Sequence, residues 1–275
     1  MLVGHGGANT IIGGKGNDTL KGLAGGDTYR YNLGDGNDTL TEDSDDDVTD
    51  QLIFSGTGLT STNVIAKRVA GTNDLFLSFN GIIGSVLVTG QFENYWDPYF
   101  GIESITFSDG VVWDENKIWN AYLTLAEDTN DVLVGHGGAN TIIGGKGNDT
   151  LTGGGGVDSF IFATITDFTT ANLGIDRITD FTLNSDKIVL GKITFAVLTS
   201  PADSALSASE FATINETTNG ATIAGASTAS IVFNRANGSL FYNPDGATAG
   251  LTGGGQFATL TGVTGLSASD FLLRA

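Results

Sequence analysis

Large apolar residues recur every nine positions in two parts of the chain, and mostly small or polar residues fill the positions between them. An aspartate or asparagine stands two residues before each of these apolar positions. The pattern predicts three-residue strands with an inward-pointing middle side chain, separated by tight turns. The apolar positions are Ile11, Leu20, Tyr29 and Leu40 in the first series, and Leu133, Ile142, Leu151 and Phe160 in the second. Leu40 lies eleven residues after Tyr29 because Tyr31 and Asn32 form a two-residue insertion.

The nine-residue unit has the form G-G-x-G-x-D-x-U-x, where U is large and apolar. Its glycines supply the positive φ angles and the close backbone approach of a tight turn. Two units make one coil of eighteen residues, so acidic or amide residues eighteen apart are expected to stack. The expected pairs are Asn9 with Asp27, Asp131 with Asp149, and Asn140 with Asp158. Carboxylates and carbonyl oxygens from neighbouring turns would form an all-oxygen cage, which calcium prefers.

One stretch of nineteen residues, LVGHGGANTIIGGKGNDTL, occurs identically at Leu2–Leu20 and at Leu133–Leu151. Asn-Asp pairs and glycines also mark ordinary hairpin turns. Four units in register, present twice, favour a repeat architecture over isolated turns. Met1 aligns with Val132, in the middle of a unit, so we expect that the chain begins inside a repeat of a longer protein.

The nonapeptides resemble the calcium-binding repeats of the RTX (haemolysin-type) family, which form a parallel β-roll. The resemblance implies that calcium is held by the carboxylate at position six and by backbone carbonyls of the preceding turn positions. Asn9 and Asn140 replace this carboxylate with an amide, which implies weaker calcium binding there. The candidate metal ligands are Gly4, Gly6, Asn9, Gly13, Gly14, Lys15, Gly16, Asp18, Gly22, Ala24, Gly25, Asp27, Gly34, Gly36, Asp38, Asp131, Gly135, Gly137, Asn140, Gly144, Gly145, Lys146, Gly147, Asp149, Gly153, Gly154, Gly155, Gly156 and Asp158.

After each set of repeats, apolar and polar residues alternate in stretches that are separated by turn residues. This pattern predicts β-rich blocks. The motifs DQLIFSGTGL, NDLFLSF and IESITFSDGVVW resemble a haemolysin-type calcium-binding-related domain, over about Tyr29 to Trp119. GIDRITDF and SDKIVLGKI resemble the region after the repeats in serralysin-type exoproteins. We therefore expect an all-β fold with two short parallel β-rolls, each followed by a capping block. The expected divisions are 1–30 and 121–162 for the rolls, and 31–120 and 163–275 for the blocks.

Composition narrows the classes of partner. The 275 residues include 31 acidic and 12 basic side chains, and the formal net charge is −19. Such a field repels nucleic acid and anionic membranes but attracts metal cations. There is no cysteine, so disulfides are excluded, and no apolar run is long enough to span a membrane. The N-terminus also lacks the basic and apolar regions of a cleaved signal peptide.

The C-terminus has an acidic residue followed by an apolar triplet, Asp270 and then Phe271, Leu272 and Leu273. This resembles the uncleaved signal of type I secretion, although a final core strand would have the same pattern. The resemblance implies a secreted, extracellular or cell-surface protein, exported by an ABC transporter and folding on extracellular calcium. It leaves two alternatives open, the C-terminal part of a larger protein with an upstream catalytic or adhesive domain, or a small RTX protein in its own right.

Other features leave alternatives open. The acidic run TEDSDDDVTD is more often a solvated loop than a further calcium site. The aromatic cluster of Phe92, Tyr95, Trp96, Tyr99 and Phe100 is more often core, but a flat patch around Trp96 would favour an adhesin that binds polysaccharide or a cell surface. His5 and His136 occupy equivalent turns and are read as turn residues rather than zinc ligands. No catalytic signature was found, so we expect a protein that is not an enzyme.

Overall fold

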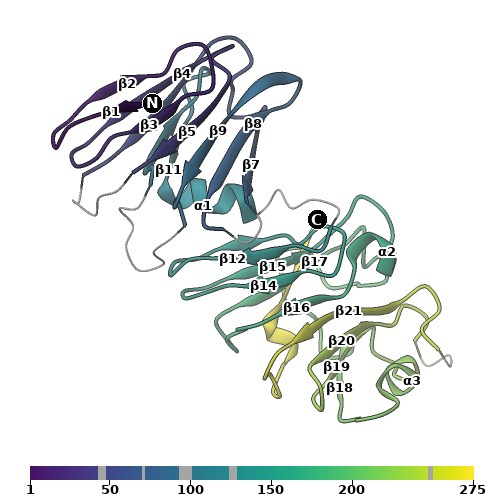
Figure 1. Cartoon of the computed structure of the whole chain (residues 1–275). Helices are drawn as coiled ribbons and strands as arrows, with labels where there is room; N and C mark the ends of the chain where they lie inside the picture. Colours follow the sequence, from purple (N-terminus) through teal and green to yellow (C-terminus); the bar gives the residue numbers. More distant parts are fainter. Residues whose placement is uncertain (43–47, 70–71, 93–100, 124–128, 247–249) are drawn as a thin grey trace. The chain divides into compact units, whose positions relative to one another are not determined.

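The structure, a computed structural model, describes residues 1–42, 48–69, 72–92, 101–123, 129–246 and 250–275. The chain forms two compact units, Met1–Leu125 and Ala126–Ala275. Each unit contains one set of repeats and the block that follows it (Figure 1). None of the helices in the described part is long and apolar enough to span a membrane.

The first unit contains two sheets that face each other. One sheet has the order β1-β3-β5-β9-β8-β7 and the other β11-β10-β6-β4-β2. Phe54 of the second sheet packs on Phe79 of the first, with ring centroids 4.9 Å apart, so the core lies between the sheets. The strands are β1 (Leu2–Val3), β2 (Thr10–Ile12), β3 (Thr19–Lys21), β4 (Thr28–Asn32), β5 (Asn37–Thr41), β6 (Gln51–Ser55), β7 (Val64–Arg68), β8 (Leu75–Phe79), β9 (Ile82–Thr89), β10 (Ser104–Thr106) and β11 (Val112–Asp114).

The second unit repeats this plan. Its sheets have the orders β12-β14-β16-β21-β20-β19-β18 and β13-β15-β17-β22. Phe162 of one sheet meets Phe257 of the other at 5.1 Å between ring centroids. The strands are β12 (Val132–Val134), β13 (Thr141–Ile142), β14 (Thr150–Thr152), β15 (Ser159–Phe162), β16 (Asp176–Ile178), β17 (Lys187–Gly191), β18 (Phe211–Ile214), β19 (Ile231–Asn234), β20 (Ser239–Tyr242), β21 (Gly255–Leu260) and β22 (Phe271–Arg274).

The repeats form parallel coils of eighteen residues, as the period predicts. Leu2 pairs with Leu20, Thr10 with Thr28, and Val132 with Thr150. The large apolar residue of every nonapeptide is buried, at 6% exposure or less. The insertion Tyr31–Asn32 lengthens β4 at its end, so the next coil is twenty residues long and Leu20 pairs with Leu40.

The blocks after the repeats first add parallel strands to the same sheets and then end them with antiparallel strands. β6 and β9 add to the first roll in parallel, as β16 and β17 do in the second. Antiparallel pairs then follow at one edge, β7-β8-β9 in the first unit and β19-β20-β21 in the second. The expected all-β fold with two parallel rolls is confirmed.

Within the described residues, four short helical segments interrupt the strands: α1 (Glu115–Leu123), α2 (Thr170–Leu173), α3 (Gly220–Gly225) and the 3₁₀ helix η1 (Ala268–Asp270). The helix α1 is absent from the sequence expectation, which gave only strands in this block. Its buried residues include Ile118, Trp119 and Tyr122, whose spacing of three and four places them on one face. Trp119 and Tyr122 pack on Phe92, each 4.7 Å from it between ring centroids.

Candidate metal centre

A ladder of acidic side chains runs along the first roll, at the positions that precede its strands. The amide of Asn9 donates to Oδ1 of Asp27 (2.7 Å), and the amide of Asp27 donates to Oδ1 of Asp50 (2.6 Å). The amide of Asp50 in turn donates to Oε2 of Glu103 (2.6 Å). Each coil therefore presents a carboxylate that binds the backbone of its neighbour, and the expected stacking of Asn9 with Asp27 is present.

A second ladder of the first unit joins the other set of turns. The amide of Asp18 donates to Oδ1 of Asp38 at 3.0 Å. Asp38 is buried, whereas Asp18, at the outer end of this ladder, is partly exposed. Although twenty rather than eighteen residues separate the two, the longer β4 keeps both aspartates in register.

The second unit also has two ladders, each with three members. The amide of Asp131 donates to Asp149 (2.8 Å), whose amide donates to Asp176 (3.1 Å). The expected pair of Asn140 with Asp158 is joined by a bond of 2.8 Å from the Asn140 amide. The amide of Asp158 then donates to Asp186 at 3.0 Å.

In Asp149, one carboxylate oxygen accepts the amide of Asp131 in the neighbouring coil, and the other is available to a ligand. Oδ2 of Asp131 and Oδ2 of Asp149 are both buried and accept no hydrogen bond within the described chain. A buried carboxylate oxygen without a partner is costly, because it has lost its hydration and gained nothing in exchange. A divalent cation would satisfy these oxygens and offset the charge.

The candidate carbonyl ligands all lie in the connections between consecutive strands of the rolls. At one of them, Gly144, a Cβ atom would lie 2.4 Å from Oδ2 of Asp149 and 2.9 Å from Oδ2 of Asp176. Glycine therefore leaves the space in which these carboxylates meet the turn. This arrangement of turn backbone and carboxylate oxygens is chemically suited to a hard cation.

Burial raises the pKa of several carboxyl groups in the ladders and of Glu42 beside them. Burial is the largest cause for Glu42 and Glu103, each of which has its pKa raised to about 8, with repulsion from Asp50 adding to the effect. The pKa of Asp158 is raised to about 6, again mainly by burial. The pKa of Asp176 is also raised by burial and by the charge of Asp149. A positive charge nearby would stabilise the ionised form of each of these groups.

Sequence reasoning missed the acidic residues that continue the ladders beyond the nonapeptides. A signal was present, because an acidic residue two positions before a buried apolar one repeats the D-x-U element of the nonapeptide. The missed residues, with their apolar partners, are Asp50 with Leu52, Glu103 with Ile105, Asp176 with Ile178, and Asp186 with Ile188.

The acidic run and the aromatic cluster fall partly outside the described residues. Asp43, Asp45, Asp46 and Asp47 of the run lie there, but its flanking residues Glu42 and Asp50 are buried, so the preferred reading as a solvated loop is wrong for these two. Tyr95, Trp96, Tyr99 and Phe100 also lie outside the described residues. Phe92 is buried against α1 and beneath Arg68, and it belongs to the core.

The two histidines belong to different units and make contacts within their own turns. Nδ1 of His136 accepts a hydrogen bond from the amide of Gly138 (2.9 Å), and burial lowers its pKa. The amide of His5 donates to Oδ1 of Asn9 at 2.7 Å. Both sets of contacts are those of turn residues.

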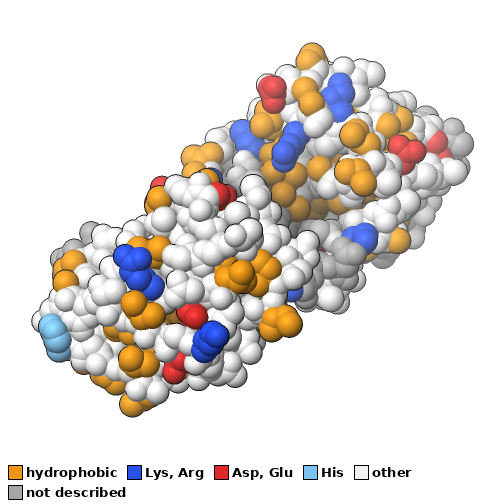
Figure 2. Space-filling view, turned by 90° about the horizontal axis from the view of Figure 1, so that it is seen from above, with side chains coloured by type: hydrophobic (Ala, Val, Ile, Leu, Met, Phe, Trp, Pro, Cys, Tyr) orange, Lys and Arg blue, Asp and Glu red, His pale blue; other side chains and the backbone are white. Residues whose placement is uncertain are grey.

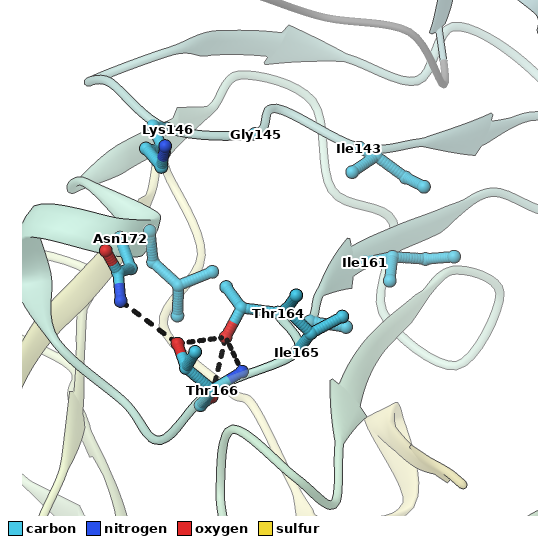
Figure 3. Close-up of a pocket in the computed structure, with 10 residues that line it drawn as sticks. Ile143, Gly145, Lys146, Ile161, Thr164, Ile165, Thr166 and Asn172 are labelled. Carbon is cyan, nitrogen blue, oxygen red and sulfur yellow. Dashed lines mark hydrogen bonds between the residues drawn. The ribbon is translucent and has the colours of Figure 1, made fainter. Parts of the chain in front are cut away.

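A pocket of about 440 Å³ opens in the second unit beside the repeats (Figure 3). Its lining includes Ile143, Ile161 and Ile165, with Asn172 donating to Thr166 at 3.1 Å. Lys146 is the ionisable residue among those that line it. The pocket offers no carboxylate and is separate in its chemistry from the ladders.

Eleven of the 31 acidic side chains are buried in the described part of the chain. Figure 2 shows the consequence on the face that it presents, where acidic side chains do not predominate despite the net charge of −19. These buried carboxyl groups are removed from water, so hydration cannot compensate the charge of those that are ionised.

Two family models match parts of the chain, and their descriptions agree with this geometry. Residues 3–40 and 126–160 match the RTX calcium-binding nonapeptide repeat, a family that binds calcium ions. Residues 74–117 match the haemolysin-type calcium binding protein related domain. No curated protein sequence matches the chain significantly. Among solved structures, the extracellular lipase LipA from Serratia marcescens aligns over 98% of this chain at 20% identity, with a TM-score of 0.31. The chain spans 39% of the length of that lipase.

Proposed function

We propose that this chain, whose residues 3–40 and 126–160 are RTX calcium-binding nonapeptide repeats, is a calcium-binding module of a secreted bacterial protein. The observation that carries the proposal is the stacking of carboxylates from successive coils. Asp131, Asp149 and Asp176 are joined by hydrogen bonds while buried oxygens of the first two lack a hydrogen-bonding partner. Calcium is the common cation that suits several oxygen ligands of this kind.

Folding coupled to calcium binding is part of the proposal. Without calcium the buried carboxylates repel one another, and the glycine-rich turns lose much conformational entropy on ordering. With calcium, the free energy of binding contributes directly to the free energy of folding. The ~10⁻⁴–10⁻³ M calcium affinity of extracellular modules would keep the chain unfolded in the cytosol and fold it outside.

Type I export fits this behaviour, because an ABC transporter of that system threads an unfolded chain. Of the C-terminal residues proposed as the export signal, Asp270 ends η1 and the apolar triplet Phe271–Leu273 lies in β22, which pairs in parallel with β17. A core strand and an export signal can be the same segment, since the signal would act before the strand forms. The proposed role is structural and ligand-binding, without a catalytic step, and a catalytic or adhesive partner domain would precede it.

The proposal is tested by far-UV circular dichroism of the full chain, stripped of calcium with a chelator and then titrated with calcium. We expect a cooperative gain of β-structure as calcium is added. Magnesium serves as the control, because it keeps its hydration shell and demands a strict octahedral geometry. A spectrum that shows full β-structure in chelator and does not respond to calcium would contradict calcium-coupled folding.

A further inference from the structure

The pocket of the second unit lies against the outer face of the sheet β13-β15-β17-β22. Ile161 stands in β15 between Phe160 and Phe162, whose side chains are buried in the core. Because successive side chains of a strand point to opposite faces, Ile161 points away from that core. Ile143 directly follows β13, in which Ile142 pairs with Phe160. Ile143 and Ile161 both line the pocket, so one side of it is aliphatic.

The opposite side of the pocket is polar and cationic. Figure 3 shows Lys146 and Asn172 across the pocket from Ile143 and Ile161. Lys146 supplies a positive charge and three hydrogen-bond donors, and its side chain is exposed, so its ammonium group is accessible from solvent. A pocket that is aliphatic on one side and cationic on the other matches a molecule with an apolar chain and an anionic head group.

Hydrogen bonds hold the segment that forms the wall of the pocket. The amide of Thr164 donates to the hydroxyl of Thr194 (2.6 Å), and the hydroxyl of Thr164 donates to the carbonyl of Thr166 (2.7 Å). The side-chain amide of Asn172 donates to the hydroxyl of Thr166 at 3.1 Å. Phe168 anchors the same segment in the core, with an exposure of 5%. The wall is therefore formed before any ligand arrives, which lowers the entropy cost of binding.

We propose that this pocket binds an aliphatic carboxylate, with its chain against Ile143 and Ile161 and its head group at Lys146. The volume of about 440 Å³ is within the range of small-molecule sites, and no acidic residue lines the pocket. Ile165 also lines it with an exposure of 92%, so a bound chain has apolar surface to cover. Burial of the chain supplies most of the affinity. The ion pair with an exposed lysine adds less and selects the anion.

The first unit contains the same lysine turn beside a different neighbour. Lys15 corresponds to Lys146 within the stretch of nineteen identical residues. Arg30, which pairs with Ile12, stands where the second unit has Ile161. A guanidinium group at that position takes away the aliphatic side of the site. We therefore expect binding at one copy of the turn, and Lys15 is the matched control for Lys146.

The test is a titration of the full chain with octanoate in saturating calcium, followed through the amide signals in two-dimensional NMR. We expect the signals of Gly145, Lys146 and Thr164 to shift and saturate, while those of Gly14 and Lys15 stay in place. Acetate, which lacks the chain, should cause no shift at the same concentration. Lys146→Met keeps an aliphatic stem but removes the charge. It should weaken octanoate binding about fivefold and leave the binding of uncharged octanol unchanged, whereas Lys15→Met should alter neither.

A second variant tests the aliphatic side. Ile161→Thr keeps a β-branched residue in the strand but removes apolar contact, so it should weaken octanoate and octanol alike. Circular dichroism in calcium checks that each variant is folded.

Three results would overturn the proposal. The first is the absence of a saturable shift at the pocket. The second is an equal shift at Lys15 and Lys146, since octanoate would then follow the lysines or the calcium of the repeat turns. The third is octanoate binding that Lys146→Met leaves unchanged, because the site would then not select an anion. None of these results bears on the proposed function, since every titration is made on the folded chain.

Discussion

At the scale of single residues, the side chain at position six can accept a backbone amide and can offer an oxygen to a cation. Aspartate can do both, whereas asparagine does only the first. Asp149 accepts the neighbouring Asp131 amide with Oδ1 and keeps Oδ2 for a ligand. Asn140 instead accepts the amide of His136 in its own turn, at 2.6 Å, and its buried Nδ2 is a donor that would repel a cation. Asn9 accepts from His5 in the same way. The asparagines stabilise the first turns of each roll, and their expected weaker calcium binding stays a prediction.

Glu210 provides a titratable contact far from the repeat carboxylates. Burial by itself would raise its pKa, but hydrogen bonds from Ser200, Ser207 and Thr199 outweigh that effect and lower the pKa to about 2. A carboxyl group whose pKa falls on folding stabilises the fold above its unfolded pKa. That contribution is lost as the pH falls from about 4.5 towards 2.

Glu210→Gln should therefore lower the free energy of unfolding at neutral pH by about 1.5–3 kcal/mol, the range for hydrogen bonds to a charged group. Between pH 4.5 and 2, the free energy of unfolding of the variant should also fall less steeply than that of the unmodified chain. Denaturant unfolding at several pH values, with Glu216→Gln as the matched variant, measures both effects. Parallel acid profiles for the Glu210 variant and the unmodified chain would contradict this account.

At the scale of elements, the turns stack as closely as the strands. Gly36 has a φ of +109°, and a Cβ on it would lie 2.0 Å from the carbonyl oxygen of Gly16 in the preceding coil. The amide of Gly16 also donates to the carbonyl of Asp35 at 2.7 Å. Both contacts place backbone against backbone, which explains why these turns consist largely of glycine.

Gly36→Ala should destabilise the first unit by more than Gly34→Ala. At Gly34 the φ is +90° but a Cβ would meet no atom within 4 Å, so only the left-handed backbone costs free energy, about 1–2 kcal/mol. At Gly36 the overlap with Gly16 adds a packing cost of about 1–3 kcal/mol. Thermal unfolding in saturating calcium compares the two variants. Equal losses would mean that the stacked turns move apart without cost.

At the scale of the whole molecule, the same plan is used twice: a short roll with two carboxylate ladders, then a block that extends the sheets and closes them with antiparallel strands. The blocks cover the edges at which further coils would otherwise add, and open edges invite association with other chains. Each unit has its own core between its own sheets and its own buried acids. Calcium is therefore expected to act on each unit separately.

Asp149→Asn should consequently affect one unit and not the other. Asp149 has one buried oxygen without a hydrogen bond and stands in the middle of its ladder, so removal of its charge should weaken calcium binding in the second unit. Calorimetry in calcium should show the transition of the second unit at lower temperature while that of the first is unchanged. A single transition that shifts as a whole would show that the units unfold together.

The nonapeptide period determined much of this protein without any structure. It predicted short strands, the buried apolar residue of each unit, the eighteen-residue coil and the stacking of Asn140 on Asp158. The strands have two to five residues where three were expected. These features follow from short-range periodicity, because a turn of fixed length places residues nine and eighteen apart in fixed relations. The sequence shows the insertion at Tyr31–Asn32, but it does not show that the two residues lengthen the strand β4.

Tertiary structure alone decided the remaining features. The helix α1 depends on a core formed with Phe92, twenty-seven residues before Trp119, which local pattern does not reveal. The cluster of Asp27, Glu42 and Asp50 depends on three segments meeting at one point, and Glu42 has no place in the repeat. In the sequence, Glu42 belongs to an acidic run of the kind that is usually solvated. Burial beside Tyr29 changes its chemistry, because a carboxylate removed from water needs a proton, a donor or a cation.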